Sequence, residues 1–299
     1  MLDASLVVPT RDRAQLLAIS LPRMLSQSLE STRYEVIVVD DGSTDSTPAV
    51  VQQLGCKHLR YVHKPSGGGV ARNRNRALEV ARGRVVIFLD DDAFVGPNFV
   101  SEHLAIHRGE SAIVAGGIVQ VRQIPAHIDE SPGWRAYHRH PMPGGNSSVC
   151  LAIIRQAGGY DESFDTFGWQ DQELAERLMA LGVRRRFAWR APIYHYKPAA
   201  YDVDMRLQLS RERERGRMGA RFYSKHPRTL VGITTKMWPP LSKLDRLATR
   251  LFSLDSLATS ILRGERKDER FPEWKAALLR AHVEIGAGRR ELESMSRTT

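Results

Sequence analysis

Strands and helices alternate along the N-terminal part of this 299-residue chain, and this alternation constrains the fold more than any other feature. Apolar, β-branched runs predict strands at Ser5–Pro9, Tyr34–Val39, Leu59–His63 and Val85–Leu89. Apolar residues at helical spacing predict helices at Arg13–Gln27, Ser46–Leu54 and Val70–Ala81. This order predicts an α/β fold with a mostly parallel central sheet and helices on both of its faces.

Polar residues follow three strands of the predicted sheet, namely Pro9-Thr10-Arg11, Asp40-Asp41 and Asp90-Asp91-Asp92. Ligands of open α/β sheets bind outside the carboxyl ends of the strands, so we expect these groups at one edge. Three adjacent carboxylates repel one another and need a counter-charge, which a divalent cation shared with substrate phosphates supplies. For the three aspartates alone, a solvated turn is the alternative interpretation.

The net charge of +10 is concentrated in the C-terminal third, where residues 201–299 contain 21 Lys and Arg against 13 Asp and Glu. This indicates an anionic partner, or else a solvated helical face with internal ion pairs. The two cysteines make no disulfide framework and fit a reducing compartment. We find no signal peptide and no apolar run of roughly 20 residues. We therefore expect a cytoplasmic protein, either free or bound peripherally at the inner face of the membrane.

The second half of the chain is less regular. It predicts a strand at Ile113–Val121, a loop at Met142–Asn146 and an amphipathic helix at Asp171–Leu181. Further on, Arg211–Arg221 alternates in charge and predicts an exposed helix, and the leucines between 244 and 261 predict a single helix with one apolar face. That apolar face either packs against the rest of the chain or against a second copy, and this is the commoner outcome. The alternative is that it rests on an anionic membrane.

Several motifs, in order, resemble those of family-2 glycosyltransferases of the GT-A fold. They are VVPT at 7–10, VVDDGSTD at 38–45, GVARN at 69–73 and FLDDD at 88–92. A second block, GGNSSV at 144–149 and GGYDESFDTFGWQDQELAERL at 158–178, is similar to the galactosyltransferase-type C-terminal segment. The resemblance covers residues 4–198. It implies a GT-A catalytic domain over residues 1–200, followed by a basic helical extension over residues 201–299.

The resemblance implies a nucleotide-sugar site in which Asp41 accepts the N3–H of a uracil ring. The other donor-site residues that it implies are Pro9, Thr10, Arg11, Arg13, Arg72, Asp90, Asp91 and Asn146. Plainer interpretations are a turn for Asp41 and Asn146, and surface charge for Arg13 and Arg72. The glycines at 67–69 could bring backbone N–H groups close to a phosphate.

The resemblance also implies a metal site. Asp92 is the implied ligand of the ion, Asp90 contacts the ribose or the metal shell, and His195 supplies a further ligand. Imidazole beside carboxylates favours Mn²⁺ over Mg²⁺. Ala93 stands where many relatives carry a fourth acid, and a packed core residue is the alternative interpretation of His195.

For catalysis, the resemblance implies that Asp171 is the general base of an inverting transfer, at the positive end of a helix. Gln170 replaces the glutamate usual in relatives, and Trp169 is either a platform for the acceptor sugar or part of the core. The alternative interpretation is that Asp171 is only an acidic residue at the N-terminus of a helix, without a catalytic role. The implied reaction moves a hexose from a nucleotide sugar, a UDP-sugar, to a glycan, glycolipid or polysaccharide, and nucleic acid is not the expected partner.

The sequence argues against two other functions. A sugar nucleotidyltransferase should carry a glycine-rich loop after its first strand, whereas residues 9–13 read PTRDR. A non-catalytic glycan- or nucleic-acid-binding protein should have lost its carboxylates, yet Asp41, Asp90, Asp92 and Asp171 are all present.

Overall fold

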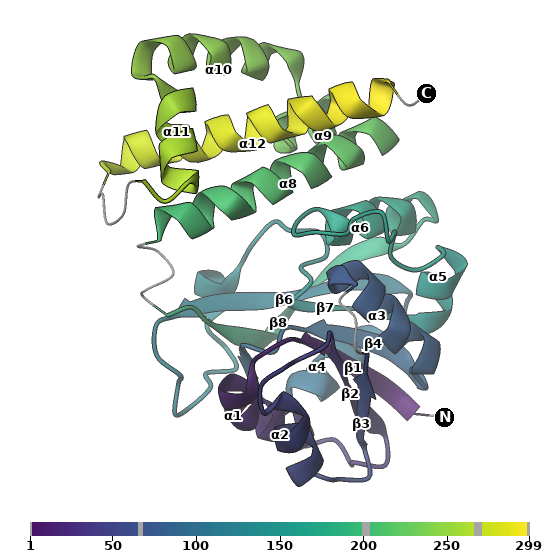
Figure 1. Cartoon of the computed structure of the whole chain (residues 1–299). Helices are drawn as coiled ribbons and strands as arrows, with labels where there is room; N and C mark the ends of the chain where they lie inside the picture. The colour runs from purple at the N-terminus through teal and green to yellow at the C-terminus, as the bar shows by residue number, and fades with distance from the viewer. Residues whose placement is uncertain (1, 65–67, 199–203, 266–270, 298–299) are drawn as a thin grey trace. The chain divides into compact units, whose positions relative to one another are not determined.

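The computed structural model describes residues 2–64, 68–198, 204–265 and 271–297 (Figure 1). The chain divides into two compact units. The first, an α/β unit, contains Met1–Asp165 and Gln170–Pro198, and the second, a helical unit, contains Thr166–Trp169 and Ala199–Thr299.

An 8-stranded sheet in the order β3-β2-β1-β4-β7-β6-β8-β5 forms the centre of the α/β unit. The strands are β1 (Leu2–Thr10), β2 (Tyr34–Asp40), β3 (Leu59–His63), β4 (Gly83–Leu89), β5 (Ala93–Val95), β6 (Ala112–Val121), β7 (Asn146–Cys150) and β8 (Arg184–Tyr196). The four strands from β3 to β4 are parallel, as the sequence predicted. Beyond β4 the sheet is mixed, because β7 runs antiparallel to both of its neighbours and β5 runs antiparallel to β8.

Helices cover both faces of this sheet, which confirms the predicted α/β class. They are α1 (Ala14–Leu25), α2 (Thr47–Gln53), α3 (Gly69–Val80), α4 (Phe99–Ile106), α5 (Leu151–Gln156) and α6 (Gln170–Ala180), with a short 3₁₀ helix η1 at Gly133–Ala136. Successive side chains of a strand point to opposite faces. In β1, Leu6 and Val8 pack into the core that includes α1 and α4, and Val7 packs into the core that includes α3, α5 and α6.

The helical unit is built around two long helices that lie side by side (Figure 1). Its helices are α8 (Met205–Lys225), α9 (Thr229–Thr234), α10 (Pro239–Phe252), α11 (Leu254–Leu262) and α12 (Glu273–Ser296). A Cβ atom on Gly216 of α8 would lie 2.1 Å from the backbone oxygen of Glu284 in α12, so glycine permits this close approach. The expectation of an exposed helix at 211–221 was therefore wrong in part, because Met218 and its small neighbours are buried.

The single helix predicted over residues 244–261 is interrupted. Ser253 adopts a left-handed backbone conformation, with φ 52° and ψ 42°, and separates α10 from α11. Leu254, Leu257 and Ile261 of α11 are buried, whereas Leu244, Leu247 and Leu251 of α10 are exposed. The leucines thus lie on two helices with different environments, and this turn separates them.

His282 of α12 links three helices of this unit. Its Nδ1 lies 3.0 Å from Oδ1 of Asp245 in α10, and its Nε2 lies 3.1 Å from Oδ1 of Asp255 in α11. Burial lowers the pKa of His282, but the hydrogen bond and charge of Asp245, joined by Asp255, outweigh burial and raise the pKa above its usual value. The imidazolium form is therefore favoured in the folded state.

We expect this histidine to stabilise the helical unit most at low pH. Because its pKa is higher in the folded than in the unfolded chain, its contribution is fully present below about pH 6.5 and is lost as pH rises through the folded pKa. The difference in melting temperature between the natural chain and His282→Gln should therefore shrink from pH 5.5 to pH 9. A difference independent of pH would contradict this assignment.

Candidate active site

A cleft lies at the carboxyl ends of β1, β2 and β4. These strands are parallel neighbours, so the segments that follow them meet at one edge of the sheet. The cavity there has a volume of about 270 Å³ and is lined by Pro9, Thr10, Arg11, Arg13, Asp41, Val70, Asn73, Asp90, Asp91 and Asp92. Of these lining residues, only Val70 and Asn73 were not predicted from the sequence.

Hydrogen bonds between strand ends hold one wall of the cleft. The Thr10 hydroxyl donates to Oδ2 of Asp91 at 2.7 Å, and the Asp41 backbone N–H donates to the Thr10 carbonyl at 3.0 Å. Burial raises the pKa of Asp91 to about 7, and the bond from Thr10 offsets part of that rise. Asp91 therefore connects β4 to β1.

The Asp41 side chain receives a backbone donor from the glycine segment before α3. Its Oδ1 accepts the N–H of Gly68 at 2.8 Å, so one of its oxygens already has a protein partner. Gly67 of the predicted phosphate-contacting run lies outside the described residues.

Asp90, Asp92 and His195 form a cluster in which one ligand atom from each lies within 4.8 Å of the others. Strand pairing brings them together: β5 follows the aspartates and pairs Ala93 with His195 in β8. His195 Nε2 lies 2.9 Å from Oδ1 of Asp92, and the side-chain nitrogen of Gln120 lies 3.2 Å from the other ring nitrogen.

Two carboxylates and one imidazole fit a divalent cation. Oδ1 of Asp92 is buried and, beyond its ion pair with His195, has no hydrogen-bond partner among the described residues. Burial lowers the pKa of His195, but the hydrogen bond and charge of Asp92 outweigh it and raise the pKa. The carboxylates therefore favour a positive charge at this place, and protein groups satisfy Asp92 only in part, as expected for ligands of a cation.

Arg74 of α3, which the sequence analysis missed, joins this cluster to the predicted base. Its buried guanidinium pairs with Oδ1 of Asp171 in the first turn of α6, lies 3.7 Å from Oδ1 of Asp90, and donates to the Gly144 carbonyl at 2.9 Å. The Tyr160 hydroxyl donates to the same Asp171 oxygen at 3.1 Å. The rings of Phe88 and Tyr160 lie 5.7 and 5.4 Å from the guanidinium carbon.

Neighbouring groups keep the buried Arg74 guanidinium in its charged form. Burial lowers the pKa of Arg74, but Asp171, followed by Tyr160 and Asp90, raises the pKa above its ordinary value. Burial raises the pKa of Asp90, and the charge of Arg74 offsets part of that effect. The helical pattern could have identified Arg74, because it lies three residues from both Ala71 and Ala77 on the buried face of α3.

The glycines at 144 and 145, rather than Asn146, approach the site. A Cβ atom on Gly144 would lie 2.6 Å from Oδ2 of Asp171, and one on Gly145 would lie 2.3 Å from Oδ2 of Asp90. Asn146 is buried at the start of β7, where it donates to the carbonyls of Gly117 and Ala191 at 2.9 Å. The structure thus places the Asn146 side chain in the sheet core and not in the cleft.

Five other predicted residues do not line the cleft. Two of them, Asp171 and His195, pair with Arg74 and with the lining residue Asp92, as described above. Arg72 is half-exposed and forms an ion pair with Glu162 at 3.0 Å. Trp169 is buried in the helical unit, where its indole N–H donates to the Arg215 carbonyl at 3.1 Å, which matches the core interpretation. Gln170, the first residue of α6, is also buried.

An open α/β sheet with a carboxylate-lined cleft at this edge is the architecture of a nucleotide-binding enzyme class. Residues 5–165 match the model of Glycosyl transferase family 2. The chain therefore belongs to this family.

Two curated relatives are similar over more than half of this chain. Validoxylamine A glucosyltransferase of Streptomyces hygroscopicus subsp. jinggangensis is 29% identical over 268 residues, which cover 76% of this chain and 61% of the relative. Chondroitin synthase of Escherichia coli is 26% identical over 65% of this chain and 34% of its own length. The chain thus spans less than two thirds of both relatives.

Solved glycosyltransferase structures share the fold. The mannosyltransferase PcManGT from Pyrobaculum calidifontis, in complex with GDP-Man and Mn²⁺, has a TM-score of 0.64 and 18% identity, and the match covers 97% of this chain and 86% of that one. S. aureus TarS 1-349 in complex with UDP-GlcNAc has a TM-score of 0.59 and 18% identity, and the match covers 100% of this chain and 93% of that one. These likenesses place the chain in the GT-A fold class.

We expect Arg74→Met to destabilise the chain by about 3–5 kcal/mol, because it leaves the Asp171 and Asp90 carboxylates without their buried cation. Urea unfolding measures the difference. Arg72→Met is the matched control on the same helix, and loss of its half-exposed ion pair should cost less than about 1 kcal/mol. Equal effects of the two substitutions would refute the central place given to Arg74.

Proposed function

We propose that this chain is a metal-dependent, inverting glycosyltransferase that moves a hexose from a UDP-sugar to a hydroxyl group of a glycan, glycolipid or polysaccharide. The observation that carries the proposal is the bridge made by Arg74 between Asp90 and Asp171. It joins the cluster of Asp90, Asp92 and His195 and a separate carboxylate in one network, and this supports a reaction with a leaving diphosphate and an attacking hydroxyl.

The nucleoside end is assigned to Asp41 and the segment Pro9–Arg13, which line the same cleft. Because Oδ1 of Asp41 already accepts from Gly68, its other oxygen suits the single N3–H of uracil better than the paired donors of guanine. Arg11 and Arg13 supply positive charge for the phosphates. This reasoning favours a UDP-sugar over a GDP-sugar.

Asp90, Asp92 and His195 would hold the cation, Mn²⁺ by preference and Mg²⁺ as the alternative, because imidazole is among the ligands. When bound, such an ion neutralises the charge that develops on the departing diphosphate. Gln120 beside His195 would fix the orientation of the ring.

Asp171 is the proposed general base. The acceptor oxygen attacks the anomeric carbon opposite the diphosphate, the bond to the diphosphate breaks, and the hydroxyl proton passes to the Asp171 carboxylate. Arg74 and Tyr160 both contact Oδ1, so they orient this carboxylate. Attack from the opposite face inverts the anomeric centre.

An exposed aromatic surface on the α/β unit supports a carbohydrate acceptor. Trp134 of η1 is 77% exposed, and Tyr137 and Trp189 are each 43% exposed. Tyr137 and Trp189 stack with ring centroids 5.5 Å apart, and Trp134 lies edge-on to Trp189 at 5.0 Å. Flat apolar rings in contact with solvent suit the C–H faces of sugar rings.

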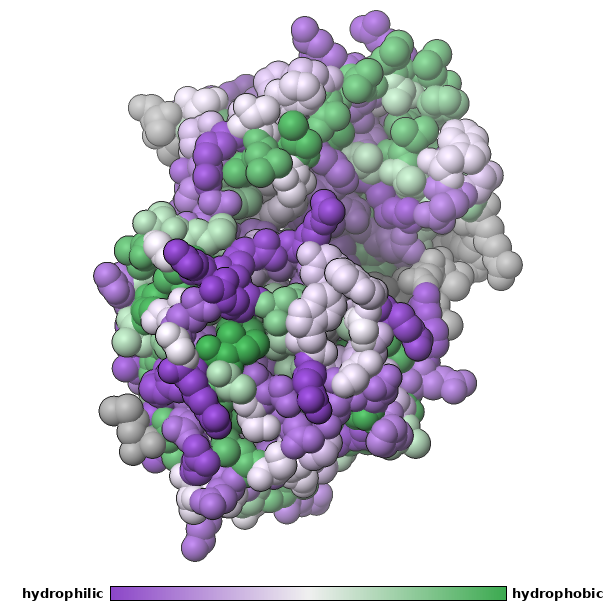
Figure 2. Space-filling view, turned by 180° about the vertical axis from the view of Figure 1, so that it is seen from behind, coloured by the Kyte–Doolittle hydropathy of each residue, from purple (hydrophilic) through white to green (hydrophobic). Residues whose placement is uncertain are grey.

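We further propose that α10 contacts an anionic membrane surface. None of the helices in the described residues is long and apolar enough to cross a bilayer. Leu244, Leu247 and Leu251 are 62%, 56% and 68% exposed on one side of α10. Its exposed charges are basic, because its one acid, Asp245, is buried. Figure 2 shows hydrophobic side chains on the surface of the helical unit.

We expect the chain to bind UDP in a Mn²⁺-dependent manner, and to bind GDP more weakly. Calorimetric titration should show affinity more than about tenfold weaker in Asp92→Ala, because a cation ligand is lost. Asp171→Asn is the matched control: it should still bind UDP, while transfer falls by about 10²- to 10⁴-fold. Binding of neither nucleotide with either metal would overturn the proposal, and tighter GDP binding would overturn the donor assignment.

For the membrane proposal, we expect the chain to co-sediment with phosphatidylglycerol vesicles at low salt and not with phosphatidylcholine vesicles. Replacing Leu244, Leu247 and Leu251 with serine should abolish binding. Leu181→Ser, at an exposed leucine of the α/β unit, is the control and should have no effect. If the triple variant instead dissociates a dimer and leaves vesicle binding unchanged, a second copy covers α10.

A further inference from the structure

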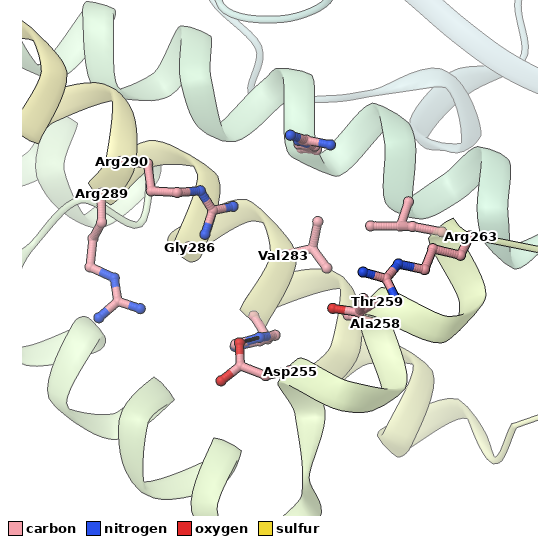
Figure 3. Close-up of a pocket in the computed structure, with 11 residues that line it drawn as sticks. Asp255, Ala258, Thr259, Arg263, Val283, Gly286, Arg289 and Arg290 are labelled. Carbon is pink, nitrogen blue, oxygen red and sulfur yellow. Dashed lines mark hydrogen bonds and ion pairs between the residues drawn. The ribbon is translucent and has the colours of Figure 1, made fainter.

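The helical unit contains a cavity of about 560 Å³ between α8, α11 and α12, shown in Figure 3. It is lined by Arg213, Asp255, Ala258, Thr259, Leu262, Arg263, His282, Val283, Gly286, Arg289 and Arg290. All of these residues belong to the helical unit and lie beyond the part of the chain that matches the family. The cavity is within the range of small-ligand sites, about 300–1,000 Å³.

Positive charge dominates the lining, which carries four guanidinium groups and one carboxylate. That carboxylate, on Asp255, already contacts His282 at 3.1 Å. Within the described residues, Arg213 and Arg290 have no acidic partner. Arg289 lies 3.6 Å from Oδ2 of Asp245, and Arg263 lies 3.8 Å from Oε1 of Glu265. The cavity therefore has an uncompensated positive charge.

Arg213, Arg263 and Arg290 line the cavity from its solvent-exposed side. In Figure 3 the side chains of Arg263 and Arg290 reach toward the same space from opposite sides, with Val283 between them. Like charges that face one cavity repel each other, and an anion between them removes that repulsion.

Gly286 supports a ligand site for a different reason. A glycine inside a helix costs about 1 kcal/mol relative to alanine, so its position needs an explanation. Gly216 and Gly288 are explained by close helix packing, because a Cβ atom on either would lie under 3 Å from neighbouring atoms. A Cβ atom on Gly286 would meet only the Arg290 guanidinium, at 3.5 Å, so this glycine keeps the cavity wall open.

We propose that this cavity binds a phosphate group, either as a free anion or as part of a phosphorylated molecule. A guanidinium group can donate two parallel hydrogen bonds to two oxygens of one phosphate. The Thr259 hydroxyl adds an uncharged donor. Ala258, Leu262 and Val283 give one wall an apolar surface, which would contact the organic part of a phosphate ester. The site is separate from the glycosyltransferase cleft and does not depend on the donor assignment.

The test titrates the 299-residue chain with inorganic phosphate by calorimetry, in EDTA so that no divalent cation recruits phosphate to the cleft. A parallel arm uses phosphatidylcholine vesicles with and without phosphatidic acid. Arg213→Gln and Arg290→Gln each remove one unpaired guanidinium. Arg297→Gln, at an exposed arginine near the end of α12, removes the same charge outside the cavity. Gly286→Leu fills the wall with a better helix former, so it tests the cavity without weakening the helix.

We expect the two cavity arginine variants to bind phosphate at least about tenfold more weakly, Gly286→Leu to lose binding, and Arg297→Gln to bind normally. If the variants differ in this way only in their binding to phosphatidic acid vesicles, the proposal is supported and the phosphate group belongs to a lipid headgroup. Equal losses in Arg297→Gln and the cavity variants, or no binding in either arm, would overturn it.

Discussion

The buried guanidinium of Arg74 is the interaction on which the arrangement of the cleft depends. A buried cation is tolerated only when carboxylates and hydrogen-bond acceptors surround it. Here Asp171, Asp90 and the Gly144 carbonyl come from three segments that are distant in sequence. The contacts of the Arg74 side chain therefore fix the start of α6, the end of β4 and the segment before β7 relative to one another.

The cleft also distributes its three adjacent aspartates among different partners. Asp90 faces Arg74, Asp91 accepts from Thr10, and Asp92 faces His195. A single guanidinium cannot balance the carboxylates of Asp90, Asp92 and Asp171 together, and the raised pKa of His195 shows that Asp92 favours a positive charge beside it. This imbalance is a physical reason, independent of any likeness to relatives, for a cation beside Asp92.

Local patterns were sufficient to predict five of the eight strands and most of the residues that line the cleft, whereas β5, β7 and β8 were not predicted. The four parallel strands follow from runs of β-branched residues, and their shared edge follows from topology. Long-range pairing was not predictable in this way. His195 reaches Asp92 only because β5 pairs antiparallel with β8, and nothing local in the sequence indicates that register. Arg74 was recoverable from the buried face of α3, whereas the motif alone directed attention to its exposed neighbour Arg72.

The helical unit shows a different limit of periodicity. A row of leucines at helical spacing predicts a face, but it does not reveal whether one backbone turn divides that face. The left-handed Ser253 makes this division, so the leucines of α11 enter the core while those of α10 stay exposed. The same turn lets Asp245 and Asp255, on either side of it, approach the two nitrogens of His282. The left-handed conformation of Ser253 thus accounts both for the contacts of His282 and for the exposed apolar face of α10. It lets α10 direct its only acid, Asp245, inward while Leu244, Leu247 and Leu251 face outward.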